Sequence, residues 1–438
     1  MSDEQHVQHL LDFIDASPSP WHVSNTIETL LSQQAAPWQR LNEASKWDIQ
    51  PGARYYVVRD DSSIVLFIPG QKQPAEAGFK IIGAHTDSPG LRIKSNAASS
   101  SDGLLRLAVE IYGGPILATF ADRDLSLAGR IAFKDTHAQI TSRLIKFDNA
   151  LLRLPNLAIH LNRTVNDDGL KFQKQTELPL ILSTLTGNQL PSEVFLDLLQ
   201  RHSGITPANI LCWDLAIYDT QKGVFWGAEN EFYTNSQLDN LASCHAALQA
   251  LLSLDTVQDE TLVCVFFDHE EIGSQSNKGA DGCFLSDVLT RIAFATQTNQ
   301  EDYARALAQS FMISADMAHA YQPNFPNAYD QNHKVFINRG PVIKINANQN
   351  YCTENMSAAM FMEWCRQAEV PYQTYSHRCD MPCGSTIGPI ASARLGIRSI
   401  DVGCPMWAMH SIRESAGVLD HEYMIRVMKR FFTANSSK

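Results

Sequence analysis

Two adjacent glutamates, Glu270 and Glu271, closely follow an apolar stretch at 261–265 that is rich in β-branched residues. Such a stretch predicts a buried strand of a parallel sheet, and ligands bind at the carboxyl ends of the strands in sheets of this kind. Neighbouring carboxylates there suit a metal site in which one binds the ion and the other accepts a proton from metal-bound water. The alternative is that both side chains are merely solvated, as most charged residues are.

Four further residues that can bind or orient a metal follow other apolar stretches predicted to be strands: His85, Asp87, Asp316 and His410. Parallel strands bring their carboxyl ends together, so these side chains are expected to converge with the two glutamates. Asp87 lies two residues after His85, a spacing at which a carboxylate can orient a ligand imidazole. Each residue alone is ambiguous, and the prediction rests on their recurrence at one kind of position.

Three other residues have two possible roles each. Asp239 precedes a long amphipathic helix predicted to end near residue 254, so it either binds a metal or caps that helix. Lys344 lies in the middle of an apolar strand predicted at 342–346, and it either reaches the surface or presents its charge into a site. His160 lies within an apolar run, where it is either a core or edge histidine or a functional one.

Together, the histidines and carboxylates suit two divalent ions. A pair of ions about 3.5–4 Å apart needs a bridging carboxylate. Two such ions bring four positive charges, three carboxylates remove three, and a hydroxide makes the cluster neutral, which favours the deprotonated water needed as a nucleophile. Glu270 would then be left uncoordinated as the proton shuttle. The expected metal ligands are His85, Asp239, Glu271, Asp316 and His410.

The elements that must position these residues predict an α/β fold with a mixed, largely parallel sheet flanked by helices. Between residues 92 and 234 the pattern changes, because strand-like runs alternate with turns and few acids cluster there. We interpret 92–234 as an inserted β-rich domain that divides the catalytic domain, formed by 1–91 and 235–438. A length of 438 residues is consistent with two or three domains.

Composition limits the partners and the compartment. The net charge of −12 argues against nucleic acid as the main partner. The sequence has no apolar run of the length a membrane span needs, so no membrane association is expected. The first residues lack the pattern of a signal peptide, and the nine cysteines are scattered, which favours reduced thiols and a cytoplasmic location.

The sequence resembles the aspartyl aminopeptidases, a family of cocatalytic zinc exopeptidases, over nearly its whole length. The resemblance rests on seven ordered segments, which are far more specific together than any one alone. They are 84–89 (AHTDSP), 159–163 (IHLNR), 237–240 (QLDN), 267–274 (FDHEEIGS), 314–319 (SADMAH), 340–344 (GPVIK) and 409–414 (MHSIRE).

The resemblance implies a zinc exopeptidase-like fold whose insertion acts as a dimerisation and lid domain. It also implies a homo-oligomeric tetrahedral shell of twelve subunits with inward-facing sites. Two divalent ions per subunit follow, most readily zinc, although cobalt and manganese also accept nitrogen and oxygen ligands. One ion would be held by His85, Asp239 and Asp316, and the other by Asp239, Glu271 and His410. Asp239 would therefore bridge the ions.

The same resemblance implies an aminopeptidase that hydrolyses unblocked N-terminal Asp or Glu residues from peptides. Glu270 would be the general base, and Asp87 would orient His85. His160 would reach the site of a neighbouring subunit and steady the oxyanion. Lys344 would meet the acidic side chain of the substrate.

Two departures from the family pattern bear on substrate preference rather than on metal chemistry. The segment 321–325 (YQPNF) replaces one of the His-Pro-Asn-Tyr type, and Ser385 stands where threonine is frequent. Two alternative functions also use the same residues. One is a dinuclear metal deacylase acting on small N-acyl compounds, and the other is a shell-forming protein whose metals are structural.

Overall fold

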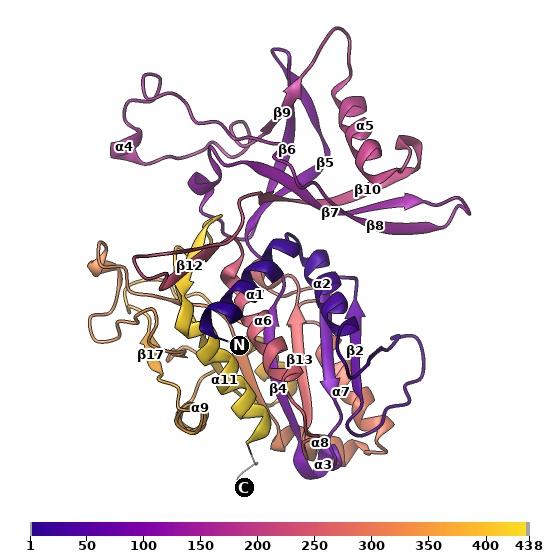
Figure 1. The fold of residues 1–438 in the computed structure, drawn as a ribbon, viewed down its shortest axis with the longest axis vertical. Coiled ribbons are helices and arrows are strands. Elements are labelled where there is room, and N and C mark those ends of the chain that lie inside the picture. Colours follow the sequence, from indigo (N-terminus) through magenta and orange to yellow (C-terminus); the bar gives the residue numbers. More distant parts are fainter. Residues whose placement is uncertain (1, 435–438) are drawn as a thin grey trace.

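The computed structural model describes residues 2–434. A mixed sheet forms the centre of the larger, lower part of the molecule in Figure 1. Within that range it has nine strands, ordered β1-β2-β3-β13-β4-β14-β18-β16-β17. The central strands β13, β4, β14 and β18 run parallel, so their carboxyl ends share one edge. In spatial order the strands are β1 (Trp38–Arg40), β2 (Arg54–Arg59), β3 (Ser63–Ile68), β13 (Thr261–Phe267), β4 (Phe79–His85), β14 (Phe311–Ala315), β18 (Arg398–Gly403), β16 (Val342–Ile345) and β17 (Gln373–Ser376).

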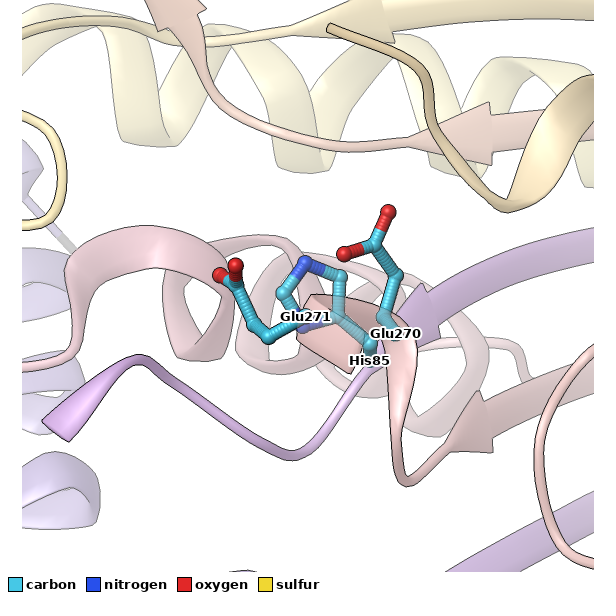
Figure 2. Close-up of side chains that lie close together, drawn as sticks. All are labelled: His85, Glu270 and Glu271. Carbon is cyan, nitrogen blue, oxygen red and sulfur yellow. The ribbon is translucent and has the colours of Figure 1, made fainter. Parts of the chain in front are cut away.

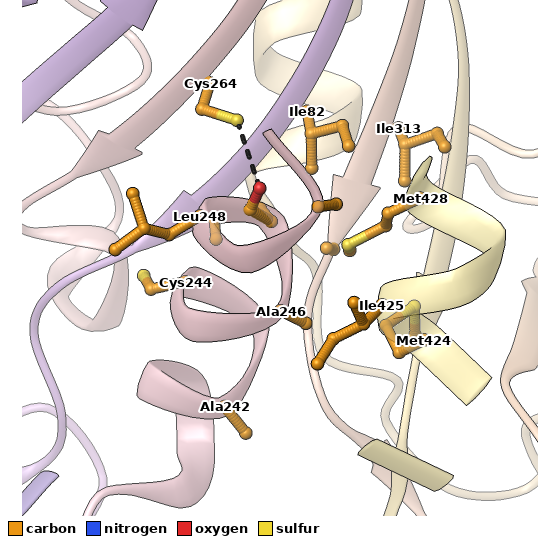
Figure 3. Close-up of a cluster of buried hydrophobic side chains, with 14 of the residues drawn as sticks. Ile82, Ala242, Cys244, Ala246, Leu248, Cys264, Ile313, Met424, Ile425 and Met428 are labelled. Atoms are coloured by element: carbon orange, nitrogen blue, oxygen red, sulfur yellow. Dashed lines mark hydrogen bonds between the residues drawn. The ribbon is translucent and has the colours of Figure 1, made fainter. Parts of the chain in front are cut away.

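Helices cover both faces of this sheet, which is why β3, β4, β13 and β14 are buried at every position and carry almost continuous apolar sequence. The helices on one face are α1 (Asp3–Ala16), α2 (Pro20–Ser32), α6 (Leu238–Leu252), α9 (Asn355–Gln367) and α11 (Val418–Thr433). Those on the other face are α7 (Phe284–Ala295), α8 (Gln300–Gln309) and α10 (Ile387–Leu395). Figure 3 shows Ile82 of β4 and Ile313 of β14 with side chains of α6 and α11.

A chain of three histidines joins α1, α6 and α11 beneath the first face. His9 Nδ1 lies 2.7 Å from His245 Nε2, and His245 Nδ1 lies 2.8 Å from His421 Nε2. His245 and His421 are fully buried. Burial lowers the pKa of His421 to about 3 and also lowers the pKa of His245, so both are neutral near pH 7.

An antiparallel sheet lies above the central sheet in Figure 1. Its strand order is β8-β7-β10-β5-β6-β9, and α5 (Pro191–Ser203) packs on it through Phe195 and Leu199. The loop after β8 carries the short helix α4 (Val165–Asp168). The strands are β5 (Gly90–Ser101), β6 (Leu104–Tyr112), β7 (Leu125–Lys134), β8 (Ile140–Lys146), β9 (Leu180–Thr184) and β10 (Ile210–Asp219).

A third, smaller sheet joins the end of the predicted insertion to the C-terminal part of the chain. Its strand β12 pairs with β20, so the segment after residue 219 pairs with the catalytic part rather than with the antiparallel sheet. The division at residues 92 and 234 therefore stays a prediction. In spatial order the strands are β11 (Val224–Trp226), β12 (Phe232–Asn235), β20 (Glu414–Gly417), β19 (Pro405–Trp407) and β15 (Ala318–His319).

The predicted α/β class, with a largely parallel sheet flanked by helices and a β-rich insertion, is confirmed. A helix begins near Asp239 as expected, but Asp239 does not cap it. Asp239 has non-helical backbone angles (φ −82°, ψ 103°), as does Asn240, and no side-chain hydrogen bond caps the start of α6. Across residues 2–434, no helix combines the length and apolarity that a membrane crossing requires.

Candidate metal centre

The carboxyl edge of the central sheet brings the predicted residues together. His85 is the last residue of β4 and pairs in register with Phe267, the last residue of β13. Glu270 and Glu271 follow on the short 3-10 helix η3 (Glu270–Ile272). Figure 2 shows the imidazole of His85 between the two glutamate side chains. Asp316 directly follows β14, the strand on the other side of β4.

His410 reaches the same place by a different route from the one predicted. It lies after β19, a strand of the small third sheet, rather than directly after β18 of the central sheet. Its positive φ of 69° marks a tight turn at this point. Sequence alone cannot separate the two strands, because both are short and only one residue lies between them.

Two groups of possible metal ligands share Asp239. In the first, His85 Nε2 lies 3.5 Å from Asp239 Oδ1 and 3.7 Å from Asp316 Oδ1. In the second, His410 Nε2 lies 3.3 Å from Asp239 Oδ2 and 3.4 Å from Glu271 Oε1. Asp239 thus presents one carboxylate oxygen to each histidine, which is the arrangement of a bridging ligand. A further group, which overlaps both, combines His85, Glu270 and Glu271.

The chemistry of this cluster fits divalent cations. Asp239 Oδ1 is buried and has no hydrogen-bond partner among the described residues. Burial, together with the charge of neighbouring carboxylates, raises the pKa of Glu270 well above its usual range and that of Glu271 to about 7. Although burial alone would lower it, the Asp239 and Glu271 carboxylates raise the pKa of His410 to about 11. Bound cations would offset this crowding of negative charge.

Asp87 holds the site in a way that sequence did not predict. His85 Nδ1 donates to the backbone carbonyl of Asp87 at 2.9 Å, whereas the nearest carboxylate oxygen is 3.5 Å away. The carboxylate instead accepts hydrogen bonds of 3.1 Å each from the backbone N–H groups of Glu270 and Glu271. Asp87 therefore fixes the imidazole through its main chain and the glutamate turn through its side chain.

Glu414 is a second support that sequence reasoning missed. It is 2% exposed, and its two oxygens accept from the backbone N–H groups of Asp239 at 3.0 Å and His410 at 2.7 Å. Burial raises its pKa well above the usual range, and the charge of Asp239 adds to the effect. One carboxylate thus fixes the backbone of two candidate ligands. The only available signal was its place in the segment 409–414.

Lys344 lies in the site rather than at the surface. It is 3% exposed, lines the same cavity of about 150 Å³ as the candidate ligands, and has its Nζ 3.4 Å from Asp316 Oδ2. His319, Tyr351 and Tyr375 also line this cavity. Burial and the nearby positive charge of Lys344 lower the pKa of His319 to about 4, so it is neutral at pH 7.

The described geometry agrees with comparisons to known proteins. The family model of the aminopeptidase I zinc metalloproteases (M18) matches residues 13–432. The chain belongs to this family of zinc aminopeptidases. It is 44% identical over 431 residues to a probable M18 family aminopeptidase 2 of Pseudomonas paraeruginosa, covering 98% of both chains. A relative of the same description from Ectopseudomonas mendocina is 42% identical over 433 residues, covering 98% of this chain and 99% of the relative.

Solved structures of the family share the whole fold. In a structure of a complex of Ape4 with Nbr1, the matching chain has a TM-score of 0.94 and 37% identity, over 98% of this chain and 86% of that one. The matching chain in a structure of the S. cerevisiae mApe1 dodecamer has a TM-score of 0.84 and 27% identity, over 98% of this chain and 96% of that one. Membership of the M18 family makes the chain a metal-dependent aminopeptidase, which sets aside the deacylase and purely structural alternatives.

His160, alone among the predicted M18 site residues, stays apart from the others within one chain. It lies on an exposed turn and does not line the cavity that holds Lys344 and the candidate ligands. Its apolar neighbours Leu157, Ile159 and Leu161 are 65%, 49% and 75% exposed. The run that predicted either a core or a functional histidine is therefore not part of the core of this chain.

Proposed function

We propose that this M18 aminopeptidase removes unblocked N-terminal Asp and Glu residues from peptides by a two-metal mechanism. The observation that carries the two-metal part is Asp239, which directs one carboxylate oxygen to His85 and the other to His410. The observation that carries the acidic preference is a buried lysine, Lys344, in the wall of the same cavity.

The proposed ligands divide into two sets with one shared member. His85, Asp239 and Asp316 hold one ion, and Asp239, Glu271 and His410 hold the other. Bound there, the divalent ions, most readily zinc, supply Lewis-acid polarisation of the scissile carbonyl and of the attacking water. Cobalt and manganese suit the same nitrogen and oxygen donors.

Glu270 is the proposed general base. It belongs to neither of the two ligand sets that share Asp239, yet its carboxylate lies within 4.8 Å of ligand atoms of His85 and Glu271. As the bond between water oxygen and carbonyl carbon forms, Glu270 accepts a proton from the water. It returns that proton to the leaving nitrogen as the peptide bond breaks.

Lys344 is the proposed determinant of acidic preference. A buried ammonium is stable only with an anionic partner, and Asp316 supplies one at 3.4 Å. An acidic side chain of the substrate would add a second partner, whereas an apolar side chain would leave the ammonium less well paired. The neutral state of neighbouring His319 means that it does not compete for that carboxylate as a cation.

His160 is proposed to act in a neighbouring subunit, and the chain is proposed to form a tetrahedral dodecamer, as one S. cerevisiae relative forms a dodecamer. The exposed Leu157, Ile159 and Leu161 around His160 support an interface at this turn, because apolar side chains of this size favour burial. A cytoplasmic location completes the proposal. It is supported by the scattered cysteines and is testable by cell fractionation.

A substrate panel tests this function. Free and N-acetylated aminoacyl substrates with Asp, Glu, Ala and Leu side chains are assayed with and without a chelator. We expect hydrolysis of the free Asp and Glu substrates and loss of activity with the chelator. Preferential hydrolysis of Ala or Leu, or cleavage of the N-acetylated compounds, would overturn the proposed specificity.

A further inference from the structure

Three consecutive residues at the end of β6 and just after it contact the candidate metal centre, although the antiparallel sheet carries none of the proposed ligands. They are Tyr112, the last residue of β6, and the two glycines that follow it, and we refer to them as the 112–114 segment. Each residue contacts a different member of the centre. The first contact is made by a side chain, the second by a glycine that leaves no room for a side chain, and the third by a backbone carbonyl.

Tyr112 bonds to the residue that fixes the glutamate turn. Its hydroxyl donates to Asp87 Oδ2 at 2.7 Å, and the same oxygen accepts from the Glu271 backbone N–H. Tyr112 is 8% exposed, and the guanidinium of Arg92 lies 3.6 Å from its ring centroid. Burial raises the pKa of Tyr112, and the negative charge of Asp87 adds to the effect, so the phenol remains a donor.

Gly113 fits against the ligand itself. It has φ of +65°, and a Cβ added to it would lie 3.1 Å from Glu271 Cβ and 3.3 Å from the Glu271 carbonyl oxygen. A side chain at this position would therefore press on Glu271. Both the left-handed backbone and the close approach favour glycine here.

Gly114 completes the contact through its main chain. Its carbonyl oxygen lies 3.1 Å from His410 Nδ1 and accepts the proton on that nitrogen, which leaves Nε2 to face Asp239 and Glu271. Two residues later, the N–H of Ile116 donates to the carbonyl of His410 at 2.9 Å. A carbonyl in this position fixes the tautomer and the ring orientation of a ligand histidine.

We propose that the 112–114 segment is a positioning element of the metal centre, through which the inserted sheet sets the geometry of Glu270, Glu271 and His410. This inference rests on the proposed ligand set. Loss of a supporting contact of this kind typically lowers metal affinity or activity by roughly 10- to 100-fold.

Two substitutions with matched controls test the role. Tyr112→Phe removes the hydroxyl and keeps the ring, and its control is Tyr218→Phe, which removes another phenol of the same sheet that donates to the Phe147 carbonyl. Gly113→Ala crowds Glu271, and its control is Gly103→Ala at the other end of β6. Gly103 has φ of +81° and no atom within 4 Å of an added Cβ, so both alanines carry similar backbone strain.

The readouts are zinc affinity by competition with a chelator, kcat and KM on a free aminoacyl substrate, and thermal unfolding. We expect Tyr112→Phe and Gly113→Ala to weaken binding of one zinc and to lower kcat, each by roughly 10- to 100-fold, with little change in KM. The two controls should match the wild type in zinc affinity and kcat. The cobalt-loaded variants should also show an altered visible spectrum.

Failure of the positioning role can be distinguished from failure of the proposed ligand set. If the wild type binds two zinc ions and hydrolyses substrate, but each variant equals its control in zinc affinity and kcat, the positioning role is wrong. Loss of thermal stability with unchanged zinc affinity and kcat would also show that the positioning role is wrong. If the wild type itself binds no pair of ions, the proposed ligand set fails instead.

Discussion

Replacing Glu270 by glutamine separates proton transfer from metal binding. The amide has nearly the same shape as the carboxylate but cannot take a proton from water. The backbone N–H of residue 270 keeps its bond to Asp87, because that bond does not involve the side chain. Glu270 is also outside the two ligand sets that share Asp239, so the variant should keep its metal.

The expected loss follows from the role. General base catalysis contributes about 10²- to 10⁴-fold to a rate, which corresponds to roughly 3–5 kcal/mol of the activation free energy. We therefore expect kcat of Glu270→Gln to fall by that factor with the metal content unchanged. The neighbouring Glu271→Gln is the matched contrast, since it removes a proposed ligand and should lower the metal content as well.

A second effect of Glu270→Gln is expected in metal-free protein. Because burial and nearby carboxylates raise the folded pKa of Glu270 above its unfolded value, its contribution to stability is full below about pH 4.5 and is lost as pH rises toward the folded pKa. Glutamine has no such loss. Metal-free Glu270→Gln should therefore unfold at a higher temperature than metal-free wild type at pH 8, and the difference should shrink toward pH 4.

The assay combines steady-state kinetics, metal analysis and thermal unfolding in the presence of a chelator. Turnover of Glu270→Gln close to that of the wild type would remove the general-base role. Loss of metal equal to that of Glu271→Gln would instead make Glu270 a ligand, as the overlapping group with His85 and Glu271 allows.

Three other changes have expected outcomes. Lys344→Met should lower kcat/KM for Asp and Glu substrates by roughly 10- to 150-fold relative to Ala and Leu substrates, because a charged hydrogen bond contributes about 1.5–3 kcal/mol; equal losses for all substrates would exclude the specificity role. His160→Ala should lower kcat, and co-expression with Glu270→Gln should restore activity if His160 serves a neighbouring subunit; mixed assemblies without activity would contradict this. His421 and His245 are neutral in the folded protein but take up protons below about pH 6.5 when it unfolds. The free energy of unfolding of metal-free protein, measured by denaturant titration, should therefore be highest above that pH and fall as pH is lowered. His421→Asn should flatten this dependence by up to about 1.4 kcal/mol per pH unit, and an unchanged slope would contradict the reasoning.

The fold class and the convergence of the site were predictable because both depend on local patterns. Apolar, β-branched stretches marked the buried strands, and an acid or histidine after such a stretch marked the functional edge. This placed His85, Glu270, Glu271 and Asp316 correctly at the carboxyl edge of the central sheet. Their individual roles remain predictions.

Contacts between distant elements were not predictable in this way. Glu414 and the 112–114 segment act from two other sheets, and no local periodicity links them to His410 or Asp239. The contacts of Asp87 were not predictable for a similar reason, because sequence alone does not show whether its backbone carbonyl or its carboxylate contacts His85. The helix-cap interpretation of Asp239 relied on residue preference alone, and the tertiary position of its carboxylate overrode that preference.

Direct measurement of metal content tests the central claim that six side chains, Glu270 included, enclose a pair of cations. Purified protein is dialysed against zinc and then against metal-free buffer, and zinc per chain is measured for the wild type and for Asp239→Asn. We expect two zinc ions per wild-type chain and weakened binding of both ions in Asp239→Asn, because Asp239 faces both histidines. One ion or none in the wild type, or loss of a single ion in the variant, would contradict a bridged pair.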